Sequence, residues 1–129
     1  MFNETTNNLF NLVGRLLLAA LFLPAGLQKI SGYAGTQGYM EAMGVPGGLL
    51  PLVILLEIGG GIALIVGFKV RWVALALAGF CGISAFMFHY QPAEQMQMIL
   101  FMKNIALAGS FLVLAGAGAG RFSLDGKQG

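Results

Sequence analysis

The sequence contains very little charge. Of its 129 residues only 9% are charged, whereas 57% are hydrophobic, and an ordinary soluble domain carries about 25% charged residues. Seven Lys or Arg and five Asp or Glu residues are too few to cover a water-facing surface. The same composition excludes a disordered chain. Together with a mean hydropathy of +0.81, it indicates an integral membrane protein that sits in a lipid bilayer.

Cysteine and histidine are scarce as well, because Cys81 and His89 are the single residues of their types. A lone cysteine excludes an intrachain disulfide and an intrachain two-thiol redox centre, and one Cys with one His cannot supply a four-ligand zinc site. The chain also lacks a glycine fingerprint for a dinucleotide or a phosphate. A net charge of +2 with scattered basic residues does not support nucleic-acid binding. We therefore expect no metal site, no intrinsic cofactor and no nucleic-acid partner.

Four apolar segments have the length of a membrane span, which needs roughly 20 apolar residues. They cover about residues 9–27, 49–66, 72–88 and 99–117. We predict an all-α fold, a single domain over residues 1–129 in which four transmembrane helices form an antiparallel up-down bundle. The stretch 31–48 between the first two spans is rich in glycine, and we expect a loop there, with a short interfacial helix over about 35–43.

The basic residues predict the orientation, because Lys and Arg in short loops are retained on the cytoplasmic side. With four spans, the N-terminal segment, the second connection and the C-terminal segment share one face. That face holds Lys69, Arg71, Arg121 and Lys127, whereas the opposite face has Lys29 alone. We therefore predict a multi-pass protein with both termini in the cytoplasm and with the glycine-rich loop and His89 on the outer side.

Three charged residues lie inside the predicted spans, namely Arg15, Glu57 and Lys103. An ionisable group in hydrocarbon costs at least about 2.5–3.5 kcal/mol on insertion scales and usually marks a site or a buried pair. With a helical rise of about 1.5 Å per residue, Arg15 lies roughly 6 Å to one side of Glu57 at the midplane and Lys103 roughly 7–8 Å to the other. Both cations are therefore expected to reach the same carboxylate. The alternative is an Arg15–Glu57 pair that locks two helices while Lys103 extends to the interface.

Further polar residues lie where the spans meet the predicted outer face. Lys29 ends the first span, His89 ends the third, and Lys103 and Asn104 begin the fourth. Together they predict an outward-opening polar cavity above Glu57, in which the imidazole exchanges protons near neutral pH. The alternative is that His89 and Lys29 are interfacial anchors at headgroup level, and for Lys29 we favour this alternative.

Methionine and aromatic side chains gather around the third connection, including Met87, Met96, Met98, Met102, Phe86, Phe88, Tyr90 and Phe101. They suit a soft pocket for a flat ligand, but such residues are more often lipid contact and core. Cys81 lies in the middle of the third span, where we expect a small packing residue.

Several motifs resemble the DoxX family of bacterial membrane proteins. They are the segment FLPAGLQK from Phe22 to Lys29, the run EIGGG from Glu57 to Gly61, the histidine that ends the third span and the pair Lys103-Asn104. The resemblance covers essentially the whole chain and implies a four-helix protein of the bacterial cytoplasmic (inner) membrane. The recurring polar positions of the family fall on Arg15, Lys29, Glu57, His89, Lys103 and Asn104.

The resemblance also implies an association with redox chemistry. One related protein is the small subunit of a thiosulfate:quinone oxidoreductase, and other members are connected with thiol stress or with aromatic and quinone-like compounds. The assignment as an oxidoreductase therefore comes from the resemblance alone, since the chain itself has no paired cysteines and no dinucleotide fingerprint.

The leading hypothesis is a redox-associated membrane protein that binds a quinone or a related carbonyl or aromatic compound in the outward-facing cavity. Catalytic roles then fall to Arg15, Glu57 and His89, and substrate binding to Lys103, Asn104 and Lys29. Arg15 and Lys103 polarise the substrate oxygens, Glu57 positions these cations, and His89 exchanges protons with the exterior. The electrons come from a partner or from the quinol itself.

Two alternatives stay open. One is a non-enzymatic scaffold or accessory subunit of a larger membrane complex, in which the intramembrane charges are structural. The other is a small proton-linked exporter of aromatic compounds, since a carboxylate at the midplane near a histidine also suits proton coupling. A homo-oligomer is open too, and the sequence does not identify the substrate.

Overall fold

A computed structural model describes residues 2–128 of the chain, and the side chain of Lys127, used above for the orientation, lies outside the described residues. The described part is helical and has no strands, so the prediction of an all-α fold is confirmed. In chain order the elements are α1 (Glu4–Ser31), α2 (Tyr33–Ala42), the 3-10 turn η1 (Gly47–Leu49), α3 (Leu50–Val66), α4 (Val70–Ser84), the π-helical turn η2 (Ala85–His89), α5 (Gln95–Ala117) and α6 (Leu124–Gln128).

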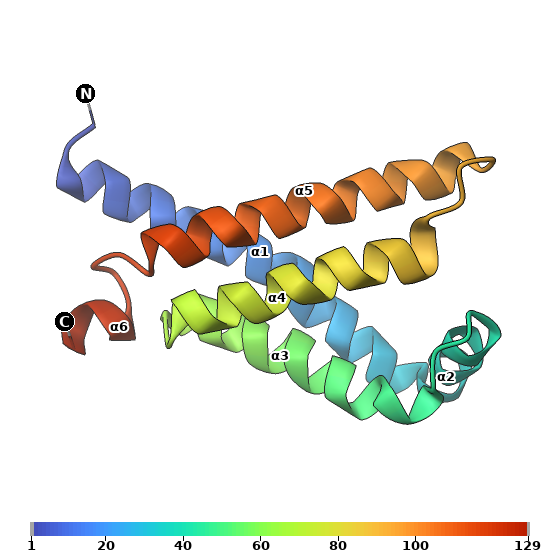
Figure 1. The fold of residues 1–129 in the computed structure, drawn as a ribbon. Helices are drawn as coiled ribbons and strands as arrows, with labels where there is room; N and C mark the ends of the chain where they lie inside the picture. The colour runs from blue at the N-terminus through green and yellow to red at the C-terminus, as the bar shows by residue number, and fades with distance from the viewer. Residues whose placement is uncertain (1, 129) are drawn as a thin grey trace.

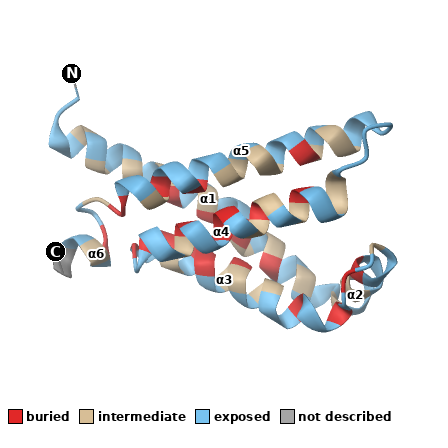
Figure 2. Ribbon diagram, in the orientation of Figure 1, coloured by how far each residue is buried: buried red, intermediate tan, exposed pale blue. Residues whose placement is uncertain are grey.

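Four helical segments are long and apolar enough to cross a membrane: Glu4–Ser31, Gly47–Val66, Val70–His89 and Gln95–Ala117. Each of them contains one of the four predicted spans. Large apolar side chains on these helices face outward, and Leu17, Trp72 and Val113 are 70%, 73% and 74% exposed. Figure 2 shows exposed residues over much of all four helices. Such faces suit contact with lipid chains, which a membrane helix makes along its length.

The four long helices pack in pairs around a shared core. The most extensive contacts join α1 to α3 and α4 to α5, and α3 also contacts α4. Phe22, Leu64, Leu77 and Phe111 are among the buried residues of this core. In Figure 1 the beginning of α1, the end of α5 and α6 lie at one end of the molecule, called here the α6 end. The helix α2 and the connection from η2 to α5 lie at the opposite end, called here the α2 end.

The stretch 31–48 is largely helical, which corrects the expectation of a glycine-rich loop. Helix α1 continues to Ser31, and α2 begins two residues later. The short helix expected over 35–43 is therefore present and starts earlier. Met40 of α2 is buried in a small apolar core of its own, and this burial offsets the cost of about 1 kcal/mol that each glycine imposes on a helix.

Helices α1 and α3 approach closely because each has a glycine at their contact. A Cβ atom on Gly26 would lie 2.6 Å from Cγ1 of Ile58, and one on Gly61 would lie 2.8 Å from Cγ of Leu23. Small residues at such positions let membrane helices come into close van der Waals contact. Gly79 of α4 is different, because it is exposed and a Cβ there would meet no atom within 4 Å.

We expect Gly61→Ala to lower the free energy of unfolding by about 1–3 kcal/mol, because the added methyl group forces Leu23 and the α1 backbone away from α3. The matched control is Gly79→Ala, which adds the same methyl group to an open position and should leave stability unchanged or slightly higher. Thermal unfolding of both variants in a mild detergent measures the difference. Equal melting temperatures for the two variants would contradict the close packing of α1 on α3.

Candidate functional site

A cavity of about 420 Å³ lies at the α2 end, where α1, α2, α3, α4, η2 and α5 all contribute to its lining. Most of the lining side chains are apolar. The charged, imidazole and amide side chains among them are Lys29, Glu57, His89, Lys103 and Asn104. The structure thus brings together five of the six predicted site residues, and Arg15 is the exception.

An ion pair between Lys29 and Glu57 forms one side of the cavity. Glu57 lies near the middle of α3, and Lys29 lies in the last turn of α1. The Nζ atom of Lys29 is 2.9 Å from Oε1 of Glu57 and donates a hydrogen bond to Oε2 at 3.2 Å. Lys29 therefore lines the cavity instead of serving as the interfacial anchor that we favoured. A buried carboxylate requires a cation within reach, and Lys29 supplies it.

Arg15 is fully buried and binds elsewhere, towards the α6 end. Its Nε donates to Oδ1 of Asn11 at 2.8 Å, and its Nη1 and Nη2 donate to the carbonyl oxygens of Leu64 and Phe122, each at 2.7 Å. The predicted network of Arg15, Glu57 and Lys103 is therefore wrong in its choice of partner for Glu57. Leu64 belongs to the last turn of α3, whose carbonyl groups have no partner within the helix. The guanidinium of Arg15 therefore binds such a carbonyl group instead of the Glu57 carboxylate.

Other polar contacts also hold the α6 end together. The carboxylate of Asp125 accepts hydrogen bonds from the backbone N–H groups of Lys69 and Val70, at 2.8 and 2.9 Å. It thereby satisfies free donors at the start of α4 and complements the positive end of the helix dipole. The guanidinium of Arg71 donates to the carbonyl oxygen of Gly116 at 2.6 Å, at the C-terminal end of α5. The start of α4 and the end of α5, which lie together at the α6 end, are thus both capped by side chains.

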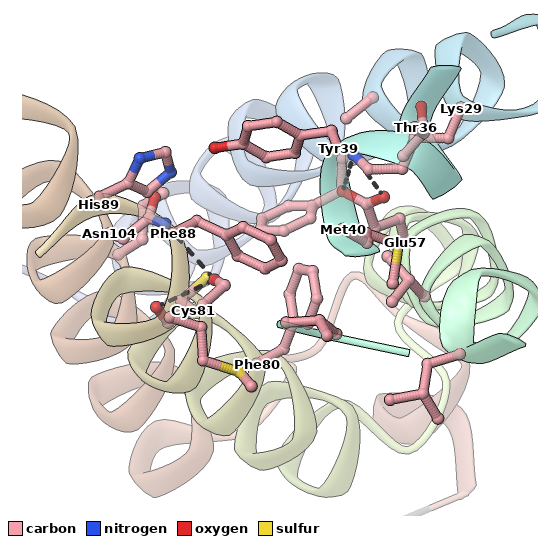
Figure 3. Close-up of a pocket in the computed structure, with 18 of the residues that line it drawn as sticks. Lys29, Thr36, Tyr39, Met40, Glu57, Phe80, Cys81, Phe88, His89 and Asn104 are labelled. Atoms are coloured by element: carbon pink, nitrogen blue, oxygen red, sulfur yellow. Dashed lines mark hydrogen bonds and ion pairs between the residues drawn. The ribbon is translucent and has the colours of Figure 1, made fainter. Parts of the chain in front are cut away.

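His89 and Asn104 lie on the opposite side of the cavity (Figure 3), and Lys103, which precedes Asn104 on α5, lines the cavity too. The ring of His89 is 2.9 Å from Gln97, between Nδ1 and the amide oxygen Oε1. Because an amide oxygen only accepts, Nδ1 donates, and the neutral ring keeps Nε2 as an acceptor. Nδ2 of Asn104 donates a long hydrogen bond to Oγ of Ser84 at 3.5 Å. Among the residues whose side chains are described, Lys103 makes no ion pair.

Aromatic rings lie between these two polar sides. Tyr39 of α2 and Phe88 of η2 stack with their ring centroids 5.5 Å apart. In Figure 3, His89 and Asn104 lie on one side of Phe88, and the Lys29–Glu57 pair lies on the other. A flat ring placed in this cavity therefore has aromatic neighbours and polar groups on both sides.

The cluster of methionine and aromatic residues divides between two places. Met87 and Phe88 line the cavity, whereas the rings of Phe86, Tyr90 and Phe101 pack against one another. Cys81 is buried and lines the cavity too. Tyr39 and Phe80 were not predicted as cavity residues, because neither is a charged residue inside a span and neither belongs to a motif that would distinguish it. Within the described residues, no three His, Cys, Asp or Glu side chains gather closely enough to hold a metal ion.

Comparisons with known proteins identify the family. The DoxX family profile matches residues 10–90. The chain belongs to the DoxX family. The inner membrane protein YqjF of Escherichia coli (strain K12) is 56% identical over 114 residues, which are 88% of each chain. The inner membrane protein YphA of the same organism is 33% identical over 121 residues, which cover 88% of this chain and 86% of that protein.

No solved structure gives a significant match. The DoxX profile covers four of the site residues discussed above, Arg15, Lys29, Glu57 and His89, whereas Lys103 and Asn104 lie beyond it. Three polar residues of the cavity, Lys29, Glu57 and His89, thus lie within the region that the family profile matches.

We expect Arg15→Met to lower the free energy of unfolding by roughly 2–4 kcal/mol, because the change leaves the carbonyl groups of Leu64 and Phe122 without their hydrogen-bond donor. It should also expose the segment around Phe122 to proteolysis. Arg121→Ala is the control, since its ion pair with Glu4 is exposed on both sides and such pairs contribute little to stability. Thermal unfolding and limited proteolysis in detergent test this, and equal behaviour of the two variants would contradict it.

Proposed function

We propose that this DoxX-family protein binds a flat aromatic compound with oxygen substituents, such as a quinone or a related carbonyl compound, in the cavity at the α2 end. The observation that carries the proposal is the combination of an apolar, aromatic lining with charged and amide groups on two sides. A volume of about 420 Å³ falls in the range of small-molecule sites, which is about 300–1,000 Å³.

Each polar group has a role in this proposal that follows from its chemistry. Lys103 and Asn104 donate hydrogen bonds to an oxygen of the ligand, since Lys103 has no ion pair among the described side chains and Asn104 has only a long hydrogen bond. Glu57 and Lys29 form the polar wall opposite, and His89 exchanges protons with the aqueous side. Arg15 has no part in ligand binding, because it is fully buried and does not line the cavity, and Nε, Nη1 and Nη2 each donate to groups towards the α6 end.

The proposal leaves the source of electrons outside this chain. A thiol pair and a dinucleotide fingerprint are both missing from the sequence, so a redox role requires a partner protein or the reduced ligand itself. Oxidoreductase activity therefore stays an expectation from the family resemblance. The ligand-binding step is the part that the cavity supports.

We also propose the inner membrane as the location, with an antiparallel order of spans and both termini in the cytoplasm. The two relatives are named inner membrane proteins. Lys69, Arg71 and Arg121 all belong to segments at the α6 end, and such an excess of basic residues is typical of the cytoplasmic side. The cavity then opens towards the outer side of the membrane.

Reporter fusions test this orientation. A green fluorescent protein fused to the C-terminus should fluoresce in cells, because that protein folds in the cytoplasm, and alkaline phosphatase fused at the same place should be inactive. Fusions after Gln91, in the connection that follows η2, should give the opposite result. The reverse pattern at both positions would overturn the proposed orientation.

Ligand binding is tested by titrating the detergent-purified protein with ubiquinone and menaquinone analogues in a calorimeter. We expect saturable binding that Lys103→Met weakens by about ten-fold, since a hydrogen bond from a charged donor contributes about 1.5–3 kcal/mol. Lys69→Met removes the same charge at the α6 end and should bind as the unaltered protein does.

Two results would contradict the proposed function. One is the lack of saturable binding by a well-folded protein, which favours the accessory-subunit interpretation. The other is that Lys103→Met, Phe88→Ala and Lys69→Met all bind the ligand with the same affinity, which would place the ligand outside the cavity.

A further inference from the structure

The Glu57 carboxylate has too few hydrogen-bond donors around it. An ionised carboxylate offers about four acceptor positions, yet the described residues supply one hydrogen bond, from Lys29 to Oε2. Oε1 is buried and accepts none, although Nζ of Lys29 lies 2.9 Å away at ion-pair distance. Buried polar atoms in native proteins nearly always have a hydrogen-bond partner. Oε1 of Glu57 therefore has acceptor capacity for a donor from outside the chain.

The cavity is the place from which such a donor can come. Glu57 is one of its lining residues, and its side chain is only 5% exposed. The terminal torsion of a glutamate is broad and two-fold, so a rotation of the carboxylate presents either oxygen to a group in the cavity. Figure 3 shows the carboxylate at the edge of the aromatic lining formed in part by Phe80 and Phe88. A ring that lies against these side chains brings its substituent to Glu57.

We infer that the ligand donates a hydrogen bond to Glu57 through an aromatic hydroxyl group. The cavity then prefers a phenol, or the reduced hydroxyl form of a quinone-type ring, over the oxidised carbonyl form. A carbonyl oxygen is only an acceptor, so it would face the carboxylate oxygen without a hydrogen between them. This inference rests on the proposed function, because it concerns the same ligand in the same cavity.

The other polar side of the cavity fits the same ligand. Lys103 donates to a second oxygen on the ring, whereas Asn104 has both a donor and an acceptor and fits a second oxygen of either kind. The ligand class is therefore a flat ring with a hydroxyl at the Glu57 side and an oxygen of either kind at the Asn104 side. The discrimination between oxidised and reduced forms resides in Glu57.

Binding to the unaltered protein tests the inference without any substitution. The detergent-purified protein is titrated calorimetrically with a para-alkyl phenol and with the methyl ether of the same phenol. We expect the phenol to bind at least about ten-fold more tightly, since the ether cannot donate to the charged acceptor. Durohydroquinone and duroquinone, compared under anaerobic conditions, have the same methylated ring, and the hydroxyl form should again bind more tightly.

Glu57→Gln then assigns the preference to this residue. Glutamine keeps the shape of the side chain and replaces one acceptor oxygen by an amide that donates. The advantage of the phenol over its methyl ether should fall to about two-fold or less, because the substitution removes the charged acceptor. Duroquinone should bind more tightly to Glu57→Gln than to the unaltered protein, because the amide can donate to its carbonyl oxygen. Lys69→Met is the control and should keep the full preference, and thermal unfolding reports whether each variant is folded.

The outcomes separate this inference from the proposed function. If all four compounds bind with equal affinity, the inference is wrong and the cavity function stands. If none of them binds, the proposed function fails and the inference fails with it. If the phenol is preferred and a folded Glu57→Gln variant keeps that preference, the donor is bound by another residue and the assignment to Glu57 is wrong.

Discussion

A charged side chain inside a bilayer must find its partners within the protein, because the hydrocarbon offers none. Arg15 and Glu57 meet this requirement in two different ways. Arg15 is surrounded by acceptors, which are a side-chain amide and carbonyl groups from two other segments. Glu57 has a cation beside it but only one hydrogen bond. The first arrangement closes the α6 end, and the second leaves unused acceptor capacity beside a cavity at the α2 end.

The division between the two ends follows from the helix termini. At the α6 end, carbonyl groups in the last turns of α3 and α5 and an N–H group at the start of α4 receive side-chain partners. At the α2 end the π-helical turn η2 carries Phe88 and His89 to the cavity, and such turns are frequent at functional sites. The residues that close the α6 end are therefore separate from those that line the cavity, and substitutions in one group need not affect the other.

The features of the fold that depend on the local sequence alone could be predicted. Segment length and composition predicted four spans, because a membrane helix satisfies its own backbone and needs only apolar length. The cost of buried charge also selected Glu57 correctly as a cavity residue. The choice between Arg15 and Lys29 as its partner could not be made from depth alone, because it depends on where the free carbonyl of Leu64 and the backbone of Phe122 lie. The sequence predicted a loop over 31–48 with a short helix only over about 35–43, whereas α2 already begins at Tyr33, and the burial of Met40 that supports it is a tertiary effect.

The hydrogen bond from Arg15 to Phe122 links residues that are 107 positions apart. A ribosome that adds about 5–20 residues per second needs roughly 5–20 s for that length of chain. During this interval α1 has already emerged, while one acceptor of its guanidinium has not been synthesised. The helix that is made first is therefore among the last to obtain its complete set of hydrogen bonds, and its insertion and its final stabilisation are separate events in the biogenesis of the protein.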